Sequence, residues 1–255
     1  MKLATWNVNS LKVRLPHLLD WLRDAEPDVV ALQELKCVDE AFPHEAIEAA
    51  GYTAVCNGQK TYNGVALLAK KPLVLQDVSR NIPGFDDEQR RVIAATVDGV
   101  RVISVYVVNG QAVGSEKFDY KLRFLAAFGD YLHEELAAHE QLAVMGDYNI
   151  APTPEDTHDP AVWEGGILCS APERAALQSL LDLGLSDAYT KPFLPEGRFT
   201  WWDYRMAGFA RNLGLRIDHI LVSEALLEWV QDWKVDLSPR RLERPSDHAP
   251  VIVTV

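Results

Sequence analysis

Residues 142–149 spell LAVMGDYN, an apolar run that leads directly into an aspartate and an asparagine. A short apolar run bounded by a turn signal is typical of a buried strand. The apolar runs within residues 3–9, 29–34 and 105–109 also end in carboxylate or carboxamide side chains, and Ser-Asp-His at residues 246–248 precedes the last run. Because strand ends are rigid, they can hold several polar groups around one point. The sequence therefore predicts buried strands whose ends share one polar site.

Strand-like runs recur along the whole chain and are rich in apolar and β-branched residues. They predict strands at residues 3–8, 28–33, 65–68, 92–97, 100–108, 142–145, 217–222 and 251–255. Between two of these runs, Asp98 and Gly99 form a pair that two-residue hairpin turns prefer. We therefore expect a β-hairpin that turns at this pair.

Helical patterns are fewer than strand patterns. Leucines at helical spacing predict a helix after a cap at Ser10, and a second helix is expected around residues 125–132. Ser170 and Glu173 have the spacing of a capping box, which predicts a third helix. A short helix is expected after Ser223.

The length of 255 residues allows one large domain or two small ones, and no linker-like segment divides the chain. We therefore expect a single domain over residues 1–255. Long strands with flanking helices predict the α/β class, in the form of a four-layer α/β sandwich of two packed mixed β-sheets with helices outside.

Composition narrows the function classes. The net charge of −12 argues against a general nucleic-acid binder, because phosphate contacts need Lys and Arg. A nuclease is not excluded, since carboxylates that hold a metal add negative charge while positive charge gathers on one face. The three cysteines lack zinc-site spacing and suggest free thiols in a reducing compartment. With no apolar run long enough for a bilayer, we expect a soluble cytoplasmic protein without a membrane partner.

The polar strand ends offer oxygen ligands for a hard cation. Any one of them alone is better explained as a turn residue. Together, Glu34, Asn7 and Asp247 would suit Mg²⁺, which prefers oxygen ligands. His248 follows Asp247, and Asp218 is a candidate partner that would orient its imidazole. The serine-hydrolase motif GxSxG and the P-loop motif GxxxxGK[ST] are absent.

Seven motifs occur in order along nearly the whole chain. They are TWNVNSL (5–11), LQELK (32–36), KTYNGVAL (60–67), GDYNIAP (146–152), FTWWDYR (199–205), GLRIDHIL (214–221) and PSDHAP (245–250). Each motif is modest alone, but the ordered set closely resembles the exonuclease III family of DNA-repair nucleases and abasic-site endonucleases.

This resemblance implies the DNase I-like form of the four-layer sandwich. It also implies a Mg²⁺-dependent hydrolase, with Mn²⁺ as an alternative ion, that acts as a 3′–5′ exodeoxyribonuclease on duplex DNA. The implied substrates are abasic sites, nicks and 3′ ends, with 3′-end processing and abasic-site incision beside the exonuclease activity. We expect the protein to act as a monomer.

The resemblance implies one set of residues that would bind the metal and activate the attacking water. Glu34 is the implied principal metal ligand, with Asn7 beside it. Asp147 would orient or deprotonate the attacking water, and Asn149 would orient Asp147 and the phosphate; both are also candidate metal ligands. Asp247 would join a second metal arrangement.

The resemblance assigns the phosphate to a second set. His248, supported by Asp218, would contact the scissile phosphate. Tyr106 and Asn109 would donate hydrogen bonds to the phosphate or to the leaving oxygen. A cationic or hydrogen-bonding group at these places would offset the charge that builds up during in-line attack.

The resemblance further implies contacts to DNA. Trp201, Leu215 and Ile217 would line a pocket for a flipped, base-less sugar, whereas Trp202 is expected in the core. Further candidates for substrate or backbone contact are Asn9, Lys60, Tyr62, Asn63, Arg205 and Arg211. Lys117, Lys121 and Arg216 are expected to add to this positive face.

Two departures and two alternatives remain open. Asn9 stands where human-type abasic endonucleases carry an aspartate, which predicts altered metal affinity rather than loss of activity. The loop at residues 153–168 does not match the loop of those enzymes, so the division between abasic incision and 3′-end processing stays open.

A phosphoesterase of lipids or small molecules could keep the same catalytic residues but not FTWWDYR with GLRIDHI, and a catalytically dead DNA-binding module is the other alternative.

Overall fold

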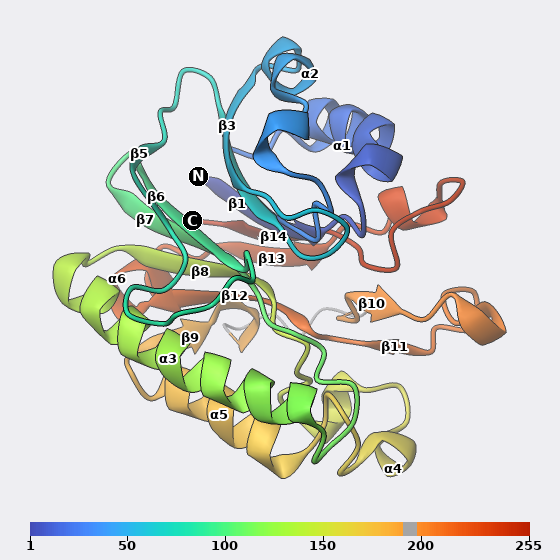
Figure 1. Ribbon diagram of the computed structural model, residues 1–255. Coiled ribbons are helices and arrows are strands. Elements are labelled where there is room, and N and C mark those ends of the chain that lie inside the picture. Colours follow the sequence, from blue (N-terminus) through green and yellow to red (C-terminus); the bar gives the residue numbers. More distant parts are fainter. Residues whose placement is uncertain (191–197) are drawn as a thin grey trace.

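The computed structural model describes residues 1–190 and 198–255. Two six-stranded sheets pack face to face, and helices cover both outer faces (Figure 1). Each sheet contains one parallel pair among antiparallel ones. The predicted four-layer α/β sandwich with mixed sheets is therefore confirmed.

The first sheet has the order β13 (Asp232–Val235), β14 (Val251–Thr254), β1 (Lys2–Asn7), β2 (Val29–Gln33), β4 (Val65–Lys70) and β3 (Tyr52–Asn57). The second has the order β5 (Gln76–Arg80), β6 (Val92–Val97), β7 (Val100–Tyr106), β8 (Leu142–Asp147), β12 (Asp218–Ser223) and β9 (Leu185–Asp187). A small sheet pairs β10 (Trp201–Trp202) with β11 (Gly214–Leu215).

The helices complete the outer layers. The α-helices are α1 (Leu11–Ala25), α2 (His44–Ala49), α3 (Glu116–Ala138), α4 (Pro160–Trp163), α5 (Ala171–Leu181) and α6 (Glu224–Leu227). Short 3₁₀ turns are η1 (Asp39–Ala41), η2 (Pro154–Asp156), η3 (Ala188–Thr190), η4 (Arg205–Ala207) and η5 (Pro239–Arg241). No helix in the described part of the chain is long and apolar enough to cross a membrane.

The alternation of side chains along each strand explains the layers. Leu3 of β1 faces the core between the sheets, whereas Ala4 and Trp6 pack in the cluster that includes α1. In β8, Met145 faces the other sheet and Val144 faces α3 and α5. Because successive strand side chains point to opposite faces, a continuous apolar run needs a partner on each side. Such runs in both sheets require a helical layer on each outer face.

Several local predictions can be compared with the structure. The hairpin turn at Asp98 and Gly99 is confirmed, and both residues have the positive φ that this turn needs, 48° and 82°. The capping box of Ser170 and Glu173 before α5 is also confirmed. Ser10 does precede α1, but its side chain makes no capping hydrogen bond.

The prediction missed the strands at the edges of the two sheets. Strand β5 has the polar sequence QDVSR and contains no fully buried residue. Strand β3 has only one sheet neighbour and leaves Thr53 exposed. An edge strand lacks the continuous apolar run that marks a central strand, so the pattern used for the central strands could not detect these two.

Strand register brings the polar strand ends together. Asn7 at the end of β1 is level with Gln33 at the end of β2, directly before Glu34. In the second sheet, Tyr106 is level with Asp147, which is also level with Asp218. The carboxyl ends of four strands and the start of β12 therefore meet along one edge of the sandwich.

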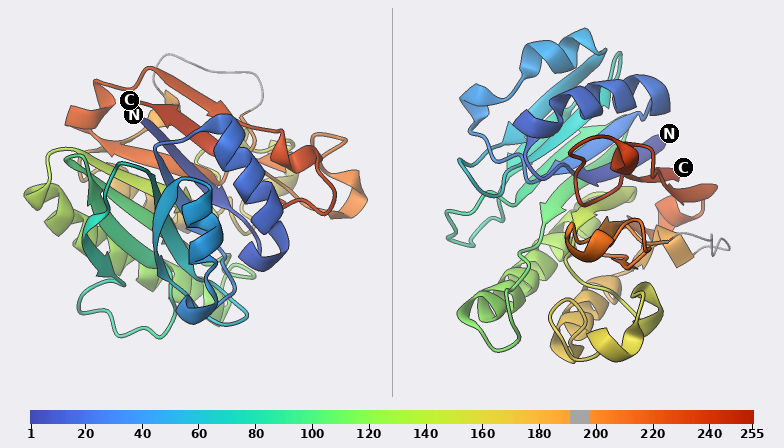
Figure 2. Two further views of the ribbon diagram at one scale, coloured as in Figure 1. Left: turned by 90° about the horizontal axis from the view of Figure 1, so that it is seen from above. Right: turned by 90° about the vertical axis from the view of Figure 1, so that its right-hand side faces the viewer.

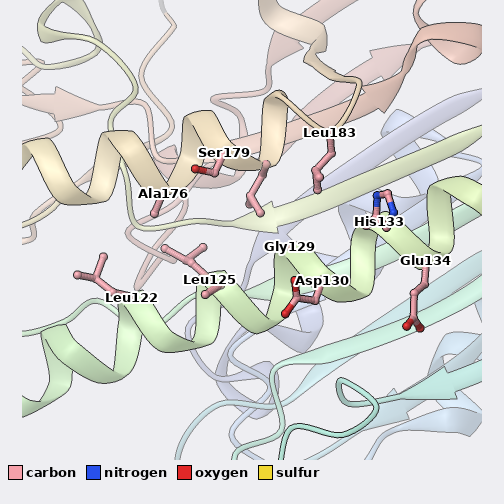
Figure 3. Close-up of a pocket in the computed structure, with 11 residues that line it drawn as sticks. Leu122, Leu125, Gly129, Asp130, His133, Glu134, Ala176, Ser179 and Leu183 are labelled. Atoms are coloured by element: carbon pink, nitrogen blue, oxygen red, sulfur yellow. The ribbon is translucent and has the colours of Figure 1, made fainter.

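A groove of about 700 Å³ runs between α3 and α5, the two helices that cover the second sheet (Figure 3). Leu125 and Leu180 contribute apolar side chains, and Asp130, His133 and Glu134 contribute polar ones. None of the predicted site residues lines this groove, so it is separate from the polar strand ends.

Candidate active site

Three side chains form the centre of the candidate site. Glu34, Asp147 and His248 each offer one ligand atom, and these atoms lie within 4.8 Å of one another. Glu34 follows β2, Asp147 ends β8, and His248 lies shortly before β14. Asp147 and His248 are buried, whereas Glu34 is partly exposed. The expectation that distant segments converge here is confirmed for these three residues.

Asn7 links the two carboxylates of this group. Its Nδ2 donates to Glu34 Oε1 at 2.8 Å and to Asp147 Oδ2 at 2.9 Å. Its Oδ1 accepts a hydrogen bond from the backbone N of Asn9 at 2.9 Å. In this orientation the amide nitrogen faces the carboxylates. Asn7 can ligate a cation between them only if its amide turns so that Oδ1 faces Glu34.

His248 is held from behind by Asp218. Its Nδ1 lies 2.9 and 3.1 Å from the two carboxylate oxygens of Asp218, and its Nε2 lies 3.7 Å from Asp147 Oδ2. Burial disfavours the charged imidazole, but the charges of Asp218 and Asp147 outweigh burial and raise the pKa of His248. Asp218 thus holds the imidazole with its Nε2 toward Asp147, in surroundings that favour its charged form.

Asp147 is the most enclosed acid of the group. Burial raises the pKa of Asp147 well above its ordinary value, and the charges of Asp218 and Glu34 add to this effect against the opposing charge of His248. Asn149 donates to its carboxylate through the backbone N at 2.9 Å and through Nδ2 at 3.2 Å. These two donors fix the direction in which the Asp147 carboxylate faces, which places it to accept a proton from a water molecule in the site.

Tyr106 and Asn109 lie at the end of β7 and just beyond it. Burial, together with the charges of Glu34 and Asp147, raises the pKa of Tyr106 well above its ordinary value. Its hydroxyl therefore stays protonated and can donate a hydrogen bond. Asn109 is exposed, and its Nδ2 lies 3.4 Å from Asn149 Oδ1.

Asp247 does not join the group of Glu34, Asp147 and His248. One of its carboxylate oxygens accepts from Asn9 Nδ2 and the other from Trp201 Nε1, both at 2.9 Å. Each oxygen of Asp247 thus has one uncharged donor, and neither faces Glu34 or Asp147 closely enough to share an ion with them. The structure therefore gives no support to the second metal arrangement expected at Asp247.

Lys36 is a site residue that sequence reasoning missed. Its Nζ lies 2.9 Å from Glu34 Oε2 and 2.6 Å from Asn9 Oδ1. It thus brings a positive charge to the carboxylate expected to bind the metal. Its place two residues after Glu34, in the motif LQELK, is the sequence signal that could have found it.

The pocket expected for a base-less sugar is closed in this structure. Leu215 and Ile217 expose 0% and 1% of their surface, in an apolar cluster that Trp201 packs against. They can touch a ligand only if neighbouring side chains move. Trp202 is buried, so its placement in the core is confirmed.

Most of the remaining candidates for DNA contact have exposed side chains. Lys60, Tyr62, Arg205 and Arg211 are all exposed. Asn63 is not: it is buried, and its Nδ2 donates to two glutamine side chains, so it shapes the turn rather than the surface.

The segment around β10 and β11 lies beside the segment that precedes β14 (Figure 2). Tyr204 Oη donates to the carbonyl oxygen of Pro245 at 2.7 Å and so joins the two segments. Arg205 pairs with Asp203 in the same stretch. The hydrogen bond of Tyr204 therefore joins this stretch to the loop that carries His248.

The expected positive face is wrong for Lys121 and Arg216. Lys121 is fully buried and pairs with Glu173, because it lies on the same face of α3 as Phe118 and Phe124. Arg216 is 2% exposed and pairs with Asp156 and Asp187. Lys121 has Phe118 and Phe124 at helical spacing, but only its distant partner distinguishes its burial from a place on a solvated face.

The ion pair of Asp156 with Arg216 should make the free energy of unfolding smaller in acid than at neutral pH. Burial raises its pKa, but the charge and hydrogen bonds of Arg216 outweigh burial, so the pKa of Asp156 lies below its ordinary value. A carboxyl whose folded pKa is depressed stabilises the fold above its unfolded pKa, about 4, and loses this contribution as pH falls through the folded pKa. Asp156→Asn should therefore cost about 3 kcal/mol at pH 7 and less at pH 3.

Urea unfolding at pH 7, 4 and 3 would measure this difference. Asp20→Asn is the control, because Asp20 pairs with Arg23 on the exposed side of α1. A pair of this kind contributes about 0–1 kcal/mol. A cost for Asp156→Asn that stays constant from pH 7 to pH 3 would contradict the prediction.

Comparison with known proteins assigns the family. Residues 4–248 match the Endonuclease/Exonuclease/phosphatase family. The chain belongs to this family. Its relatives within the Endonuclease/Exonuclease/phosphatase family include exodeoxyribonuclease III of Haemophilus influenzae, 40% identical over 267 residues that cover 98% of each chain.

Solved structures of the same family superimpose closely. A 3′ phosphatase from Neisseria, bound to a product DNA hairpin, is 52% identical with a TM-score of 0.96 and covers 99% of this chain and 98% of its own. An AP endonuclease from Archaeoglobus fulgidus is 35% identical with a TM-score of 0.94, covering 100% and 98%. The resemblance to the exonuclease III family and its DNase I-like fold is confirmed.

The family consists of metal-dependent phosphodiesterases, and the donor set of this chain fits that chemistry. Glu34 and Asp147 offer carboxylate oxygens, the ligands that a hard divalent cation prefers. His248 Nε2 in the same group faces Asp147 while Nδ1 is bound to Asp218. The residues present therefore fit a hard divalent ion, which the carboxylate oxygens of Glu34 and Asp147 would hold.

Proposed function

We propose that this chain is a Mg²⁺-dependent DNA-repair phosphodiesterase that processes 3′ ends of duplex DNA as a 3′–5′ exonuclease and incises abasic sites. The convergence of Glu34, Asp147 and His248 within 4.8 Å carries this proposal. The relatives named exodeoxyribonuclease III, 3′ phosphatase and AP endonuclease support it. We further propose that residues 1–255 act as one domain, as a cytoplasmic monomer, and that Mn²⁺ can replace Mg²⁺.

The site residues divide the work of in-line attack. Asp147 accepts the proton of the attacking water, and Asn149 holds the Asp147 carboxylate in place. The imidazolium of His248 offsets negative charge on the scissile phosphate, and Tyr106 donates to the same oxygens. A divalent ion held by Glu34 would supply positive charge beside the phosphate.

Around this centre, exposed side chains are proposed to bind the DNA backbone. They are Lys60, Tyr62, Arg205 and Arg211, with Asn9 and Asn109 nearer the phosphate. Concentrating these groups on one face lets a chain of net charge −12 approach DNA. We propose that Trp201 contacts the sugar beside the lesion, since it is partly exposed and bound to Asp247.

Three labelled duplexes test the function: one with an abasic site, one with a recessed 3′ end and one with a 3′-phosphate. Each is incubated with Mg²⁺, with Mn²⁺ and with EDTA. We expect cleavage with either ion and none with EDTA. A soluble phosphate monoester is the control, and turnover of that ester without turnover of any duplex would overturn the proposal in favour of a small-molecule phosphoesterase.

Glu34→Gln is expected to raise the Mg²⁺ concentration needed for half-maximal cleavage by about 10-fold or more. The substitution keeps the size of the side chain but removes the charge that attracts the cation. A Mg²⁺ titration of cleavage measures the shift, with Glu48→Gln on the exposed end of α2 as control. An unchanged titration midpoint would remove Glu34 from the metal site.

A further inference from the structure

Lys121 is a fully buried lysine whose three donors are all used. Its Nζ donates to the backbone O of Asn149 at 2.7 Å and to the backbone O of Asn109 at 3.2 Å, and it pairs with Glu173. An ammonium group has three hydrogens and no acceptor, so these contacts satisfy it completely. Lys121 therefore joins α3 to the loops after β7 and β8, which carry the two asparagines.

Both carbonyls belong to residues whose side chains face the candidate site. Asn149 has a positive φ of 50°, a left-handed conformation that asparagine adopts more readily than most other residues. Its backbone N and Nδ2 hold Asp147, and its Nδ2 also donates to the backbone O of Val107. Because Lys121 Nζ donates to the carbonyl oxygen of Asn149, it holds in place the residue that orients Asp147.

Glu173, the partner of Lys121, connects this lysine to α5. Besides Lys121, its carboxylate accepts hydrogen bonds from the backbone N of Leu168 and from the backbone N and Oγ of Ser170. Glu173 is fully buried and lies in the first turn of α5, which runs beside α3 (Figure 1). The ion pair therefore connects both helices of this layer to the two asparagine loops.

The loop after Asn109 packs tightly on the Lys121 stem. Gly110 has a φ of 94°, and a Cβ there would lie 3.2 Å from Lys121 Cδ and 3.0 Å from Ile167 Cδ1. Only glycine fits this approach without strain. The loop is thus fitted to the lysine by its shape as well as by the hydrogen bond to the Asn109 carbonyl.

We propose that Lys121 is a positioning residue for the reaction: through the Asn149 and Asn109 carbonyls it sets the angle at which Asn149 presents Asp147 to the attacking water. This inference rests on the proposed nuclease function. Geometry of this kind matters because a displacement of about 1 Å at a catalytic group can lower the rate about 100-fold. The competing explanation is that Lys121 and Glu173 contribute only to stability.

A double substitution separates the two explanations. Lys121→Met alone leaves the Glu173 charge buried without its partner, which destabilises the fold. Lys121→Met with Glu173→Gln removes both charges and keeps an acceptor oxygen for Ser170, so it should be less destabilising than Lys121→Met alone. Urea unfolding measures stability, and cleavage of the recessed 3′ duplex measures kcat and KM.

Arg101 and Glu135 provide a matched control. They form another largely buried ion pair, which joins β7 to α3, and the Arg101 guanidinium contacts none of the site residues. Arg101→Met with Glu135→Gln should lower stability while leaving kcat unchanged. It therefore reports how far a change of stability alone affects turnover.

We expect kcat of the Lys121→Met/Glu173→Gln variant to fall about 10- to 100-fold with KM within about threefold of the wild type. Wild-type kcat in this variant, or an equal fall in the Arg101 control, would overturn the inference. A wild-type protein that cleaves no duplex would instead reject the proposed function, so the two failures are distinguishable.

Discussion

Asp147→Asn is expected to lower kcat at least about 100-fold while DNA affinity stays nearly unchanged. An asparagine has the shape of the aspartate, and its Oδ1 can still accept from the backbone N of Asn149. It cannot accept the proton of a water molecule at neutral pH. The loss should therefore fall on the chemical step rather than on binding.

Single-turnover cleavage and equilibrium DNA binding would separate these two effects. Asp98→Asn is the matched control, because Asp98 lies in the hairpin turn at the opposite end of β7 from Tyr106 and asparagine also tolerates its positive φ. The control should keep full activity. Wild-type turnover in Asp147→Asn would show that another group activates the water.

His248→Ala should also lower kcat about 100-fold or more, because it removes the positive charge that faces the phosphate. It should lower stability as well. The Asp218 carboxylate is 1% exposed and bound to His248, and breaking a buried charge pair by removing one partner costs about 3 to 5 kcal/mol.

The double variant His248→Ala/Asp218→Asn distinguishes the catalytic from the structural loss. With both members of the pair neutral, the free energy of unfolding should return toward the wild-type value. We expect kcat to stay low, because the charge near the phosphate is still missing. Activity that returns together with stability would mean that His248 only maintains the fold.

The sandwich could be predicted because the local sequence of its central strands shows that they are buried. Runs such as residues 142–145 are apolar at every position, so each needs packing on two faces. Convergence of Glu34, Asp147 and His248 could be predicted because each flanks such a strand. What the runs do not encode is their register, and register sets which side chains touch.

The contacts that sequence reasoning missed depend on partners far along the chain. The buried Lys121 pairs with Glu173, 52 residues later, and the buried Arg216 pairs with Asp156, 60 residues before it. A charged residue next to apolar ones is as typical of a solvated surface as of a buried pair, and only the partner decides between them. The amide orientation of Asn7 likewise follows from the two carboxylates it bridges.

Strand β14 inserts between β13 and β1, so the last strand of the chain joins the first. During synthesis, β1 is made well before residues 251–254 and lacks this neighbour until they follow. His248 is made after Glu34 and Asp147. A chain that stops before residue 248 therefore lacks both the completed sheet and the imidazole of the proposed site.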